Sequence, residues 1–150
     1  MAYAKNGEFN VLYPTRRRMA NILKRIVDAE LGEYSEGTLV NSIRINAKIT
    51  GFQKLEIQIV AAYYFIFLNN GAYLWNGGVI TPRDFVAQFT EELAATGITA
   101  EIYSQYTEWL TKKYPLVEAI EVLERQQKLV YTFEALYAPP DFVQGYPLDV

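Results

Sequence analysis

Two runs of alternating apolar and polar residues, joined by a short turn, constrain the fold of this chain more than any other feature. The apolar positions of the first run, residues 39–49, are Ile43, Ile45, Ala47 and Ile49, and those of the second are Leu55, Ile57, Ile59 and Ala61. Alternation puts the apolar side chains of a strand on one face. Two such runs around the glycine-containing turn at residues 50–52 predict an antiparallel β-hairpin. Because an isolated hairpin is marginally stable, its apolar face must be covered by helices.

Helical periodicity occurs on both sides of this hairpin. Apolar residues at three- and four-residue spacing predict helices at about residues 15–31, 82–96, 100–114 and 116–127. Gly32 and Gly97 occupy positions typical of C-terminal caps. Residues 128–137 are rich in β-branched and aromatic side chains, which predicts a further strand. The predicted fold class is α+β: an antiparallel β-hairpin-based sheet packed against an N-terminal helix and two or three further helices, with a C-terminal strand.

The composition predicts one folded domain over residues 1–150. Hydrophobic residues make up 51% of the chain and charged residues 21%, as in globular proteins. We expect residues 1–13 to form an N-terminal arm and residues 98–150 to form a helical extension followed by a tail. The N-terminus lacks the apolar segment of a signal peptide, and the longest apolar run, residues 57–68, is too short to span a bilayer.

The residue types present leave little room for catalysis. Histidine and cysteine are both absent, which excludes histidine bases, cysteine nucleophiles, thiolate zinc sites and disulfides. Glu118, Glu121 and Glu124 share one predicted helix face, which is better interpreted as a solvated face than as a catalytic or metal site. Gly77-Gly78 lacks the remainder of a phosphate-binding loop. We therefore expect no enzymatic activity, no metal and no cofactor.

The first predicted helix is basic. Arg16, Arg17 and Arg18 begin it, and Lys24 and Arg25 follow. These residues could contact phosphates or an acidic neighbour, or simply form a solvated face; three consecutive residues spread over most of a turn and cannot form one patch by themselves. Charge is also uneven along the chain, with 9 basic and 6 acidic residues in positions 1–75 but 5 and 11 in positions 76–150. Such a division suits head-to-tail self-association or a polarised surface.

A second candidate site is the loop at residues 69–80. It carries Tyr73, Leu74 and Trp75 close to three glycines, at positions 71, 77 and 78. An aromatic run precedes it, and a helix follows whose start is predicted from Thr81 as the cap, Pro82 as the first helical residue and Asp84 as the capping-box acid. Because exposed Trp and Tyr often dominate interfaces, we expect this loop to be a binding surface. The alternative is that Trp75 folds back over its own core.

Three short motifs occur in a recognisable order. Gly37, Leu39, Ser42 and Ile43 match a "TGxLxxSI" pattern, residues 63–71 match a "YAxxxExG" pattern, and Pro82 and Phe85 match "PFL". In this order the motifs resemble those of the tail-completion (neck, head–tail joining) proteins of tailed bacteriophages, over about residues 15–97. The chain differs from the pattern in having Asn69-Asn70 in place of the acid before the glycine, in the two residues between Pro82 and Phe85, and in its longer C-terminal extension.

The resemblance implies a structural virion protein located in the neck or tail and assembled in the host cytoplasm. Such a protein would form a ring of six or twelve subunits between the portal connector and the tail proteins, as a neck, tail-completion or tail-terminator protein. DNA would pass through the lumen without specific binding, and no membrane would be involved. The resemblance also implies that residues 62–70 form a short helix, whereas their periodicity alone equally allows a continued strand.

Other classes of function remain open at this point. One is a small nucleic-acid-binding protein that uses its basic N-terminal helix, and another is a hydrolase with a carboxylate pair.

Overall fold

The computed structural model describes residues 8–31, 38–50, 54–73, 75–113, 119–120, 128–136 and 146–147. Its helices are α2 (Tyr13–Leu31), α3 (Thr38–Ser42), α4 (Phe65–Asn70), α5 (Phe85–Ala95) and α6 (Ile98–Lys113). Its strands are β1 (Phe9–Asn10), β2 (Arg44–Thr50), β3 (Lys54–Ala61), β4 (Ala72–Tyr73), β5 (Val79–Ile80), β6 (Lys128–Ala135) and β7 (Tyr146–Pro147). None of the helices within these ranges has the length and hydropathy needed to cross a membrane.

The main sheet has the strand order β1-β2-β3-β6-β7. β2 and β3 form the predicted antiparallel hairpin, in which Ile45 faces Ile59 and Ile49 faces Leu55. β6 runs parallel to β3, so the sheet is mixed, and the chain between these two strands must cross from one end of the sheet to the other. That crossover contains α4, the small β4–β5 hairpin, α5 and α6.

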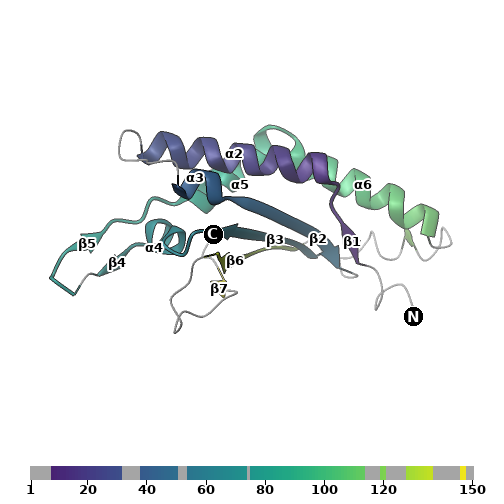
Figure 1. Cartoon of the computed structure of the whole chain (residues 1–150). Coiled ribbons are helices and arrows are strands. Elements are labelled where there is room, and N and C mark those ends of the chain that lie inside the picture. Colours follow the sequence, from purple (N-terminus) through teal and green to yellow (C-terminus); the bar gives the residue numbers. More distant parts are fainter. Residues whose placement is uncertain are drawn as a thin grey trace.

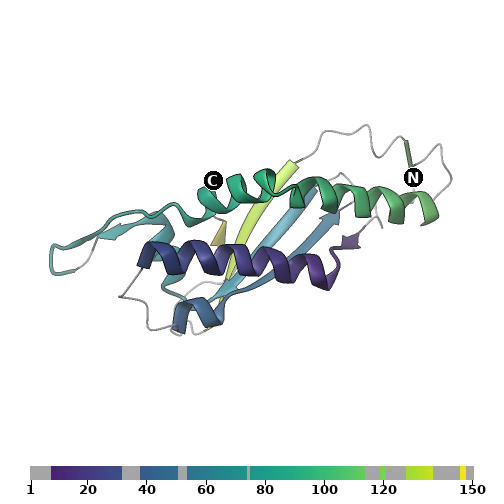
Figure 2. The same cartoon turned by 90° about the horizontal axis from the view of Figure 1, so that it is seen from above.

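The helices α2, α5 and α6 lie on one face of this sheet, as Figure 1 shows, and Figure 2 shows α2 running beside α5 and α6. The alternating apolar residues of the strands point into this layer and are buried against the helices. The largest buried side chains of the core are Tyr106, Tyr131, Phe65, Phe85, Phe89, Phe133, Met19 and Leu23. The predicted α+β fold class is confirmed.

The first strand begins later than predicted. Residues 39–42 belong to the short helix α3, and β2 starts only at Arg44. The Ser42 hydroxyl explains this, because it donates to the Leu39 carbonyl at 2.6 Å and accepts from the Ala62 N–H at 3.0 Å. A serine that bonds to nearby backbone offers the chain an alternative to a strand ladder and favours a turn.

The predicted start of α5 was also wrong. The helix begins at Phe85 rather than Pro82, and Asp84 is its N-cap residue, with a left-handed φ of 52° and no capping hydrogen bond from its side chain. The Arg83 N–H is already bonded to the Leu68 carbonyl of α4 at 3.0 Å. Residues 81–84 therefore follow a path fixed by α4 instead of forming a first helical turn.

Several predicted elements are confirmed with small shifts at their ends. The first helix spans Tyr13–Leu31, so the N-terminal arm is shorter than residues 1–13, and the segment after β3 contains the short helix α4. The C-terminal strand is β6, Lys128–Ala135. The cap at Gly32, most of the predicted helix at residues 116–127 and most of the tail lie outside the described residues. Of that predicted helix, Ala119 is buried and Ile120 is exposed.

Candidate functional site

The most prominent surface feature is the β4–β5 hairpin, which projects from one end of the molecule (Figures 1 and 2). Its strands pair Ala72 with Ile80 and Tyr73 with Val79. The turn between them is formed locally: the Asn76 side-chain oxygen accepts a hydrogen bond from the Gly78 N–H at 2.9 Å. Such a side-chain turn is typical of Asn followed by glycine.

The hairpin exposes large side chains almost completely. Trp75 is 98% exposed, Tyr73 is 91% exposed and Val79 is 62% exposed. The alternative that Trp75 folds over its own core does not occur in this structure. Leu74, the third residue predicted for this site, lies outside the described residues. Exposed apolar groups gathered on one projecting element are typical of a surface that another molecule covers.

The base of the hairpin, in contrast, is held by buried groups. Asn69 in α4 is only 3% exposed, and its Oδ1 atom accepts a hydrogen bond from the Val86 N–H at 2.9 Å. Val86 is the second residue of α5, one of the positions whose N–H has no partner within the helix. Asn69 therefore caps α5 from outside, in place of Thr81 or Asp84. The same side chain donates to the Asn70 Oδ1 atom.

Gly71 forms the junction between α4 and the hairpin. Its φ of 80° and ψ of 165° lie in a region that is essentially restricted to glycine. A Cβ atom at this position would lie 2.8 Å from the Ile80 carbonyl oxygen and 2.8 Å from the Pro82 ring. The two ends of the hairpin can approach this closely only because residue 71 has no side chain.

A further set of contacts joins the hairpin base to the end of α2. The Arg83 Nη1 atom donates to the Glu30 carbonyl at 3.3 Å, and the Gln88 amide donates to the Arg83 carbonyl at 3.0 Å. In the core beside this point, the Phe65 ring lies 5.7 Å from that of Phe85. The hairpin is thus a projecting, apolar tip on a base fixed by α2, α4 and α5.

The three predicted arginines do not act as one site. Arg16 and Arg17 face β2, where they line a groove, while Arg18 forms an ion pair with Glu101 of α6. That pair is substantially exposed, so its contribution to stability is about 0–1 kcal/mol. Arg17 and Glu30 are separated by about 20 Å along α2, given a rise of about 1.5 Å per residue. The arginines and the hairpin are therefore separate surfaces.

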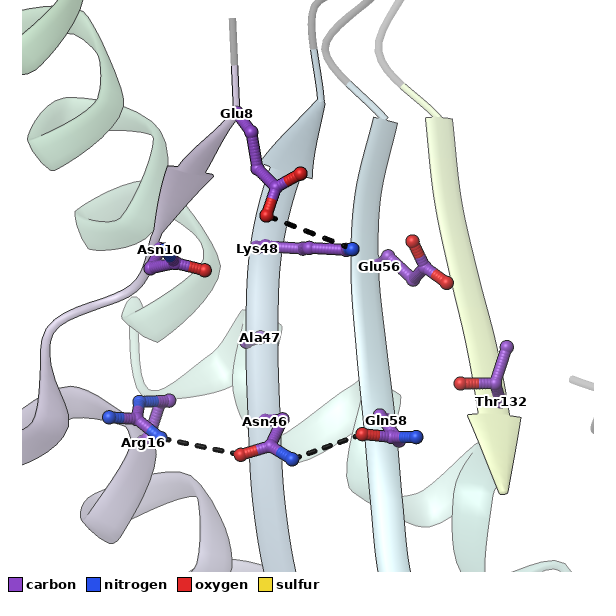
Figure 3. Close-up of a pocket in the computed structure, with 9 residues that line it drawn as sticks. All are labelled: Glu8, Asn10, Arg16, Asn46, Ala47, Lys48, Glu56, Gln58 and Thr132. Atoms are coloured by element: carbon purple, nitrogen blue, oxygen red, sulfur yellow. Dashed lines mark hydrogen bonds and ion pairs between the residues drawn. The ribbon is translucent and has the colours of Figure 1, made fainter. Parts of the chain in front are cut away.

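The sheet face away from the helices is polar and contains a hollow of about 480 Å³, shown in Figure 3. A chain of hydrogen bonds crosses it from Arg16 to the Asn46 Oδ1 atom, from Asn46 to Gln58 at 3.0 Å, and from Gln58 to Glu134 at 2.8 Å. The hollow contains both cations and carboxylates, so its charges largely compensate one another. This is the solvent-facing side expected of an antiparallel sheet region covered on one face.

The described residues offer few of the pKa shifts or metal-ligand clusters that mark a catalytic site. Burial raises the pKa of the Tyr103 and Tyr131 phenols, which leaves both protonated at neutral pH. No group of three or more His, Cys, Asp or Glu residues close enough to hold a metal ion occurs in the described ranges. Glu118, Glu121 and Glu124 lie outside them.

Comparison with protein-family models, with curated proteins and with solved structures found no match to this chain.

Sequence reasoning missed the role of Asn69 and the contribution of β2 to the groove beside Arg16 and Arg17, where Arg44 adds a further cation. A signal for Asn69 existed: in a helix, positions 65 and 69 share a face, so a buried Phe65 places Asn69 on the core side, where an amide needs partners. The sequence holds no comparable signal for the groove, because Lys24 of α2 and Arg44 of β2 are brought together only when these two elements pack side by side.

Proposed function

We propose that this chain is a structural, non-enzymatic virion protein of a tailed bacteriophage that assembles into a ring at the head–tail junction. The observation that carries the proposal is the projecting β4–β5 hairpin, with its almost fully exposed Trp75 and Tyr73 on a fixed base. In this role, the ring joins the portal connector to the tail and lets DNA pass, and the hairpin is the contact between subunits.

The motif residues that carry the resemblance support this proposal by their positions. Ser42 bonds to the Ala62 N–H at the end of β3, and Phe85 packs on Phe65. Gly71 ends α4 and contacts Pro82 closely. The second and third motifs thus meet at the base of the hairpin, and the first lies beside the end of β3, from which the chain enters α4 and the hairpin.

The energetics of exposed aromatic residues also favour an interface. Truncation of a Trp or Tyr at the centre of an interface typically costs about 2 kcal/mol or more in binding. Because the base is already ordered by hydrogen bonds, little conformational entropy is lost when the tip docks. A hairpin that docks on a different surface of the next subunit makes a heterologous contact, and such contacts close into rings when the rotation allows it.

The proposal is tested with Trp75→Ala, measured by light scattering of the purified protein and by incorporation into particles. We expect the wild type to form a closed oligomer and the variant to remain a monomer, with the melting temperature of the monomer unchanged because Trp75 contacts no core. Tyr13→Ala is the matched control, since Tyr13 is another exposed aromatic residue, on α2 and away from the hairpin.

Two results would contradict the proposal. One is a wild-type protein that stays monomeric both in solution and in the presence of connector and tail proteins. The other is a Trp75→Ala variant that unfolds, with assembly following only the folded fraction.

A further inference from the structure

A second surface, distinct from the hairpin, gathers positive charge between α2 and β2. It is a groove of about 320 Å³, lined by Tyr13, Arg16, Arg17, Ala20, Asn21, Lys24, Ile43, Arg44, Ile45 and Asn46. Four of these side chains are cations, two are amides, and none is a carboxylate. The chain as a whole has a net charge of -3, so this groove is a local concentration of charge opposite in sign to the protein.

The helical repeat explains how these cations gather. Tyr13, Arg17, Asn21 and Lys24 recur at three- and four-residue spacing and therefore share one side of α2. That side faces the start of β2, which supplies Arg44. Arg18 and Arg25 point elsewhere, toward Thr96 and Ile98 near the α5–α6 junction.

Within the described residues, no ion pair offsets the charge of Arg17, Lys24 and Arg44 in the groove. Among the same described residues, these three also form no side-chain hydrogen bond. The first turn of α2 contains no acidic residue, so the positive end of the helix dipole adds to the side-chain charges. Arginines at this end of a helix are repelled by the helix dipole. A bound anion would be attracted both to the dipole and to the arginines, and would offset this repulsion.

Arg16 is held in position at the edge of the groove. Its Nε atom donates to the Val11 carbonyl at 3.0 Å, its Nη1 atom donates to the Asn46 Oδ1 atom at 3.4 Å, and its guanidinium lies 5.5 Å from the centre of the Tyr13 ring. Figure 3 shows Arg16 directed toward Asn46. Tyr13 is 63% exposed even with this contact, so it is accessible to a further planar group.

We propose that this groove binds the phosphodiester backbone of nucleic acid, with an unpaired base stacking on Tyr13. Arg17, Lys24 and Arg44 contact the phosphate oxygens, and Arg16 supplies charge from its fixed position. Cations that track a backbone beside an exposed aromatic ring are the combination used for single strands. An acidic protein segment could pair with the cations of the groove, but it would offer no planar group to stack on the Tyr13 ring. The inference does not rest on the proposed function, because the groove is complete in one subunit.

Binding of this kind is weak, independent of sequence and sensitive to salt. Each phosphate that is neutralised contributes about −0.7 to the slope of log K against log salt for a single strand. Three contacts therefore predict a slope of about −2.

The test measures fluorescence anisotropy of a labelled oligothymidylate and of a labelled duplex with the full chain at low salt. The triple variant R17A/K24A/R44A is compared with R25A/K112A/K113A, which removes the same charge from exposed positions outside the groove. We expect the groove variant to lose affinity for both probes by about tenfold or more and the control by about twofold or less. Tyr13→Ala should weaken binding of the oligothymidylate but not of the duplex. Circular dichroism checks that each variant is folded.

Three results would overturn the inference: no binding by the wild type at low salt, equal losses in the groove variant and the control, or unchanged nucleic-acid affinity in a groove variant that fails to assemble. The last result would assign the groove to an acidic surface of another protein. Trp75→Ala separates the two proposals, because it should abolish assembly and leave oligonucleotide binding by the monomer intact.

Discussion

Asn69 caps a helix to which it does not belong: its side-chain oxygen accepts a hydrogen bond from the Val86 N–H at 2.9 Å. The two residues lie on either side of the β4–β5 hairpin, so this one bond ties the helix before the hairpin to the helix after it. The hairpin tip can therefore carry exposed apolar side chains without depending on them for its position. In the proposed function, stability and recognition would therefore reside in different residues of the same element and be separable by mutation.

Replacement of Asn69 by Ala should destabilise the monomer by about 1–3 kcal/mol, because the Val86 N–H would be buried without a partner. The melting temperature should decrease by about 2–4 °C for each kcal/mol of lost stability. Asn76→Ala is the control, since Asn76 also accepts a hydrogen bond from a backbone N–H, that of Gly78, but at an exposed position, and it should cost less than about 1 kcal/mol. Equal melting temperatures for the two variants would mean that the Asn69–Val86 bond does not hold the base.

Gly71 and Gly77 offer a second matched pair. Both have positive φ, 80° and 87°, but a Cβ atom at Gly77 would meet nothing within 4 Å, whereas one at Gly71 would overlap Ile80 and Pro82. Gly77→Ala should cost only the backbone strain, about 1–2 kcal/mol. Gly71→Ala should cost clearly more and should increase hydrogen exchange of the Arg83 amide, which bonds to Leu68. Urea unfolding of both variants measures the free energy of unfolding that each loses. A smaller loss for Gly71→Ala than for Gly77→Ala would contradict the close approach of Gly71 to Ile80 and Pro82.

The sequence was most informative where the physics is local. Alternation located β3 and most of β2, and three- and four-residue spacing located α2, α5 and α6, because these patterns follow directly from strand and helix geometry. It also placed Tyr73 and Trp75 on a loop between two anchored elements. The exposure of these two residues follows from the projection of the hairpin, which the sequence did not determine.

What could not be predicted depends on contacts between distant residues. Thr81, Pro82 and Asp84 form a plausible helix start, but the Leu68 carbonyl takes the Arg83 N–H and Asn69 supplies the cap. Similarly, the parallel pairing of β6 with β3 is decided by the path of the intervening chain rather than by the residues of either strand. In the groove, Arg44 joins Arg17 only because β2 packs beside α2. Local propensity is overridden by tertiary contacts in each case.

Stability should decrease in alkaline solution through the buried tyrosines. Burial raises the pKa of Tyr131 above the usual value of 10.0, while a hydrogen bond with the Thr90 hydroxyl, 2.9 Å away, partly opposes this increase. Because the unfolded chain loses its phenolic proton at a lower pH than the folded chain, the stabilisation is complete below pH 10 and is lost as the pH rises through the folded pKa. Tyr131→Phe should flatten the decrease, measured by urea unfolding between neutral and alkaline pH. If the free energy of unfolding of Tyr131→Phe depends on alkaline pH as steeply as that of the wild type, burial does not hold the Tyr131 proton in the folded protein.

The two tryptophans provide a direct optical test of the hairpin. Trp75 is 98% exposed, whereas Trp109 packs against the core beside Phe9 and Tyr106, with ring centres 5.5 and 5.8 Å apart. In a Trp109→Phe variant, Trp75 is the single tryptophan of the chain, so excitation at the red edge of the indole band reports on it alone. As a monomer, this variant should emit at the long-wavelength position of indole in water and should be quenched efficiently by iodide.

If Trp75 is buried between subunits, its emission should move to shorter wavelength and the quenching should decrease as the protein concentration is raised through the assembly threshold. The reciprocal variant, Trp75→Phe, reports only on Trp109, whose emission should stay constant because its surroundings lie within one subunit. Phe at position 75 also retains part of the apolar surface, so this variant should still assemble, more weakly than the wild type. Emission of Trp75 that remains at the water-exposed position in the assembled ring would exclude the hairpin tip from the subunit interface, even if the ring itself forms.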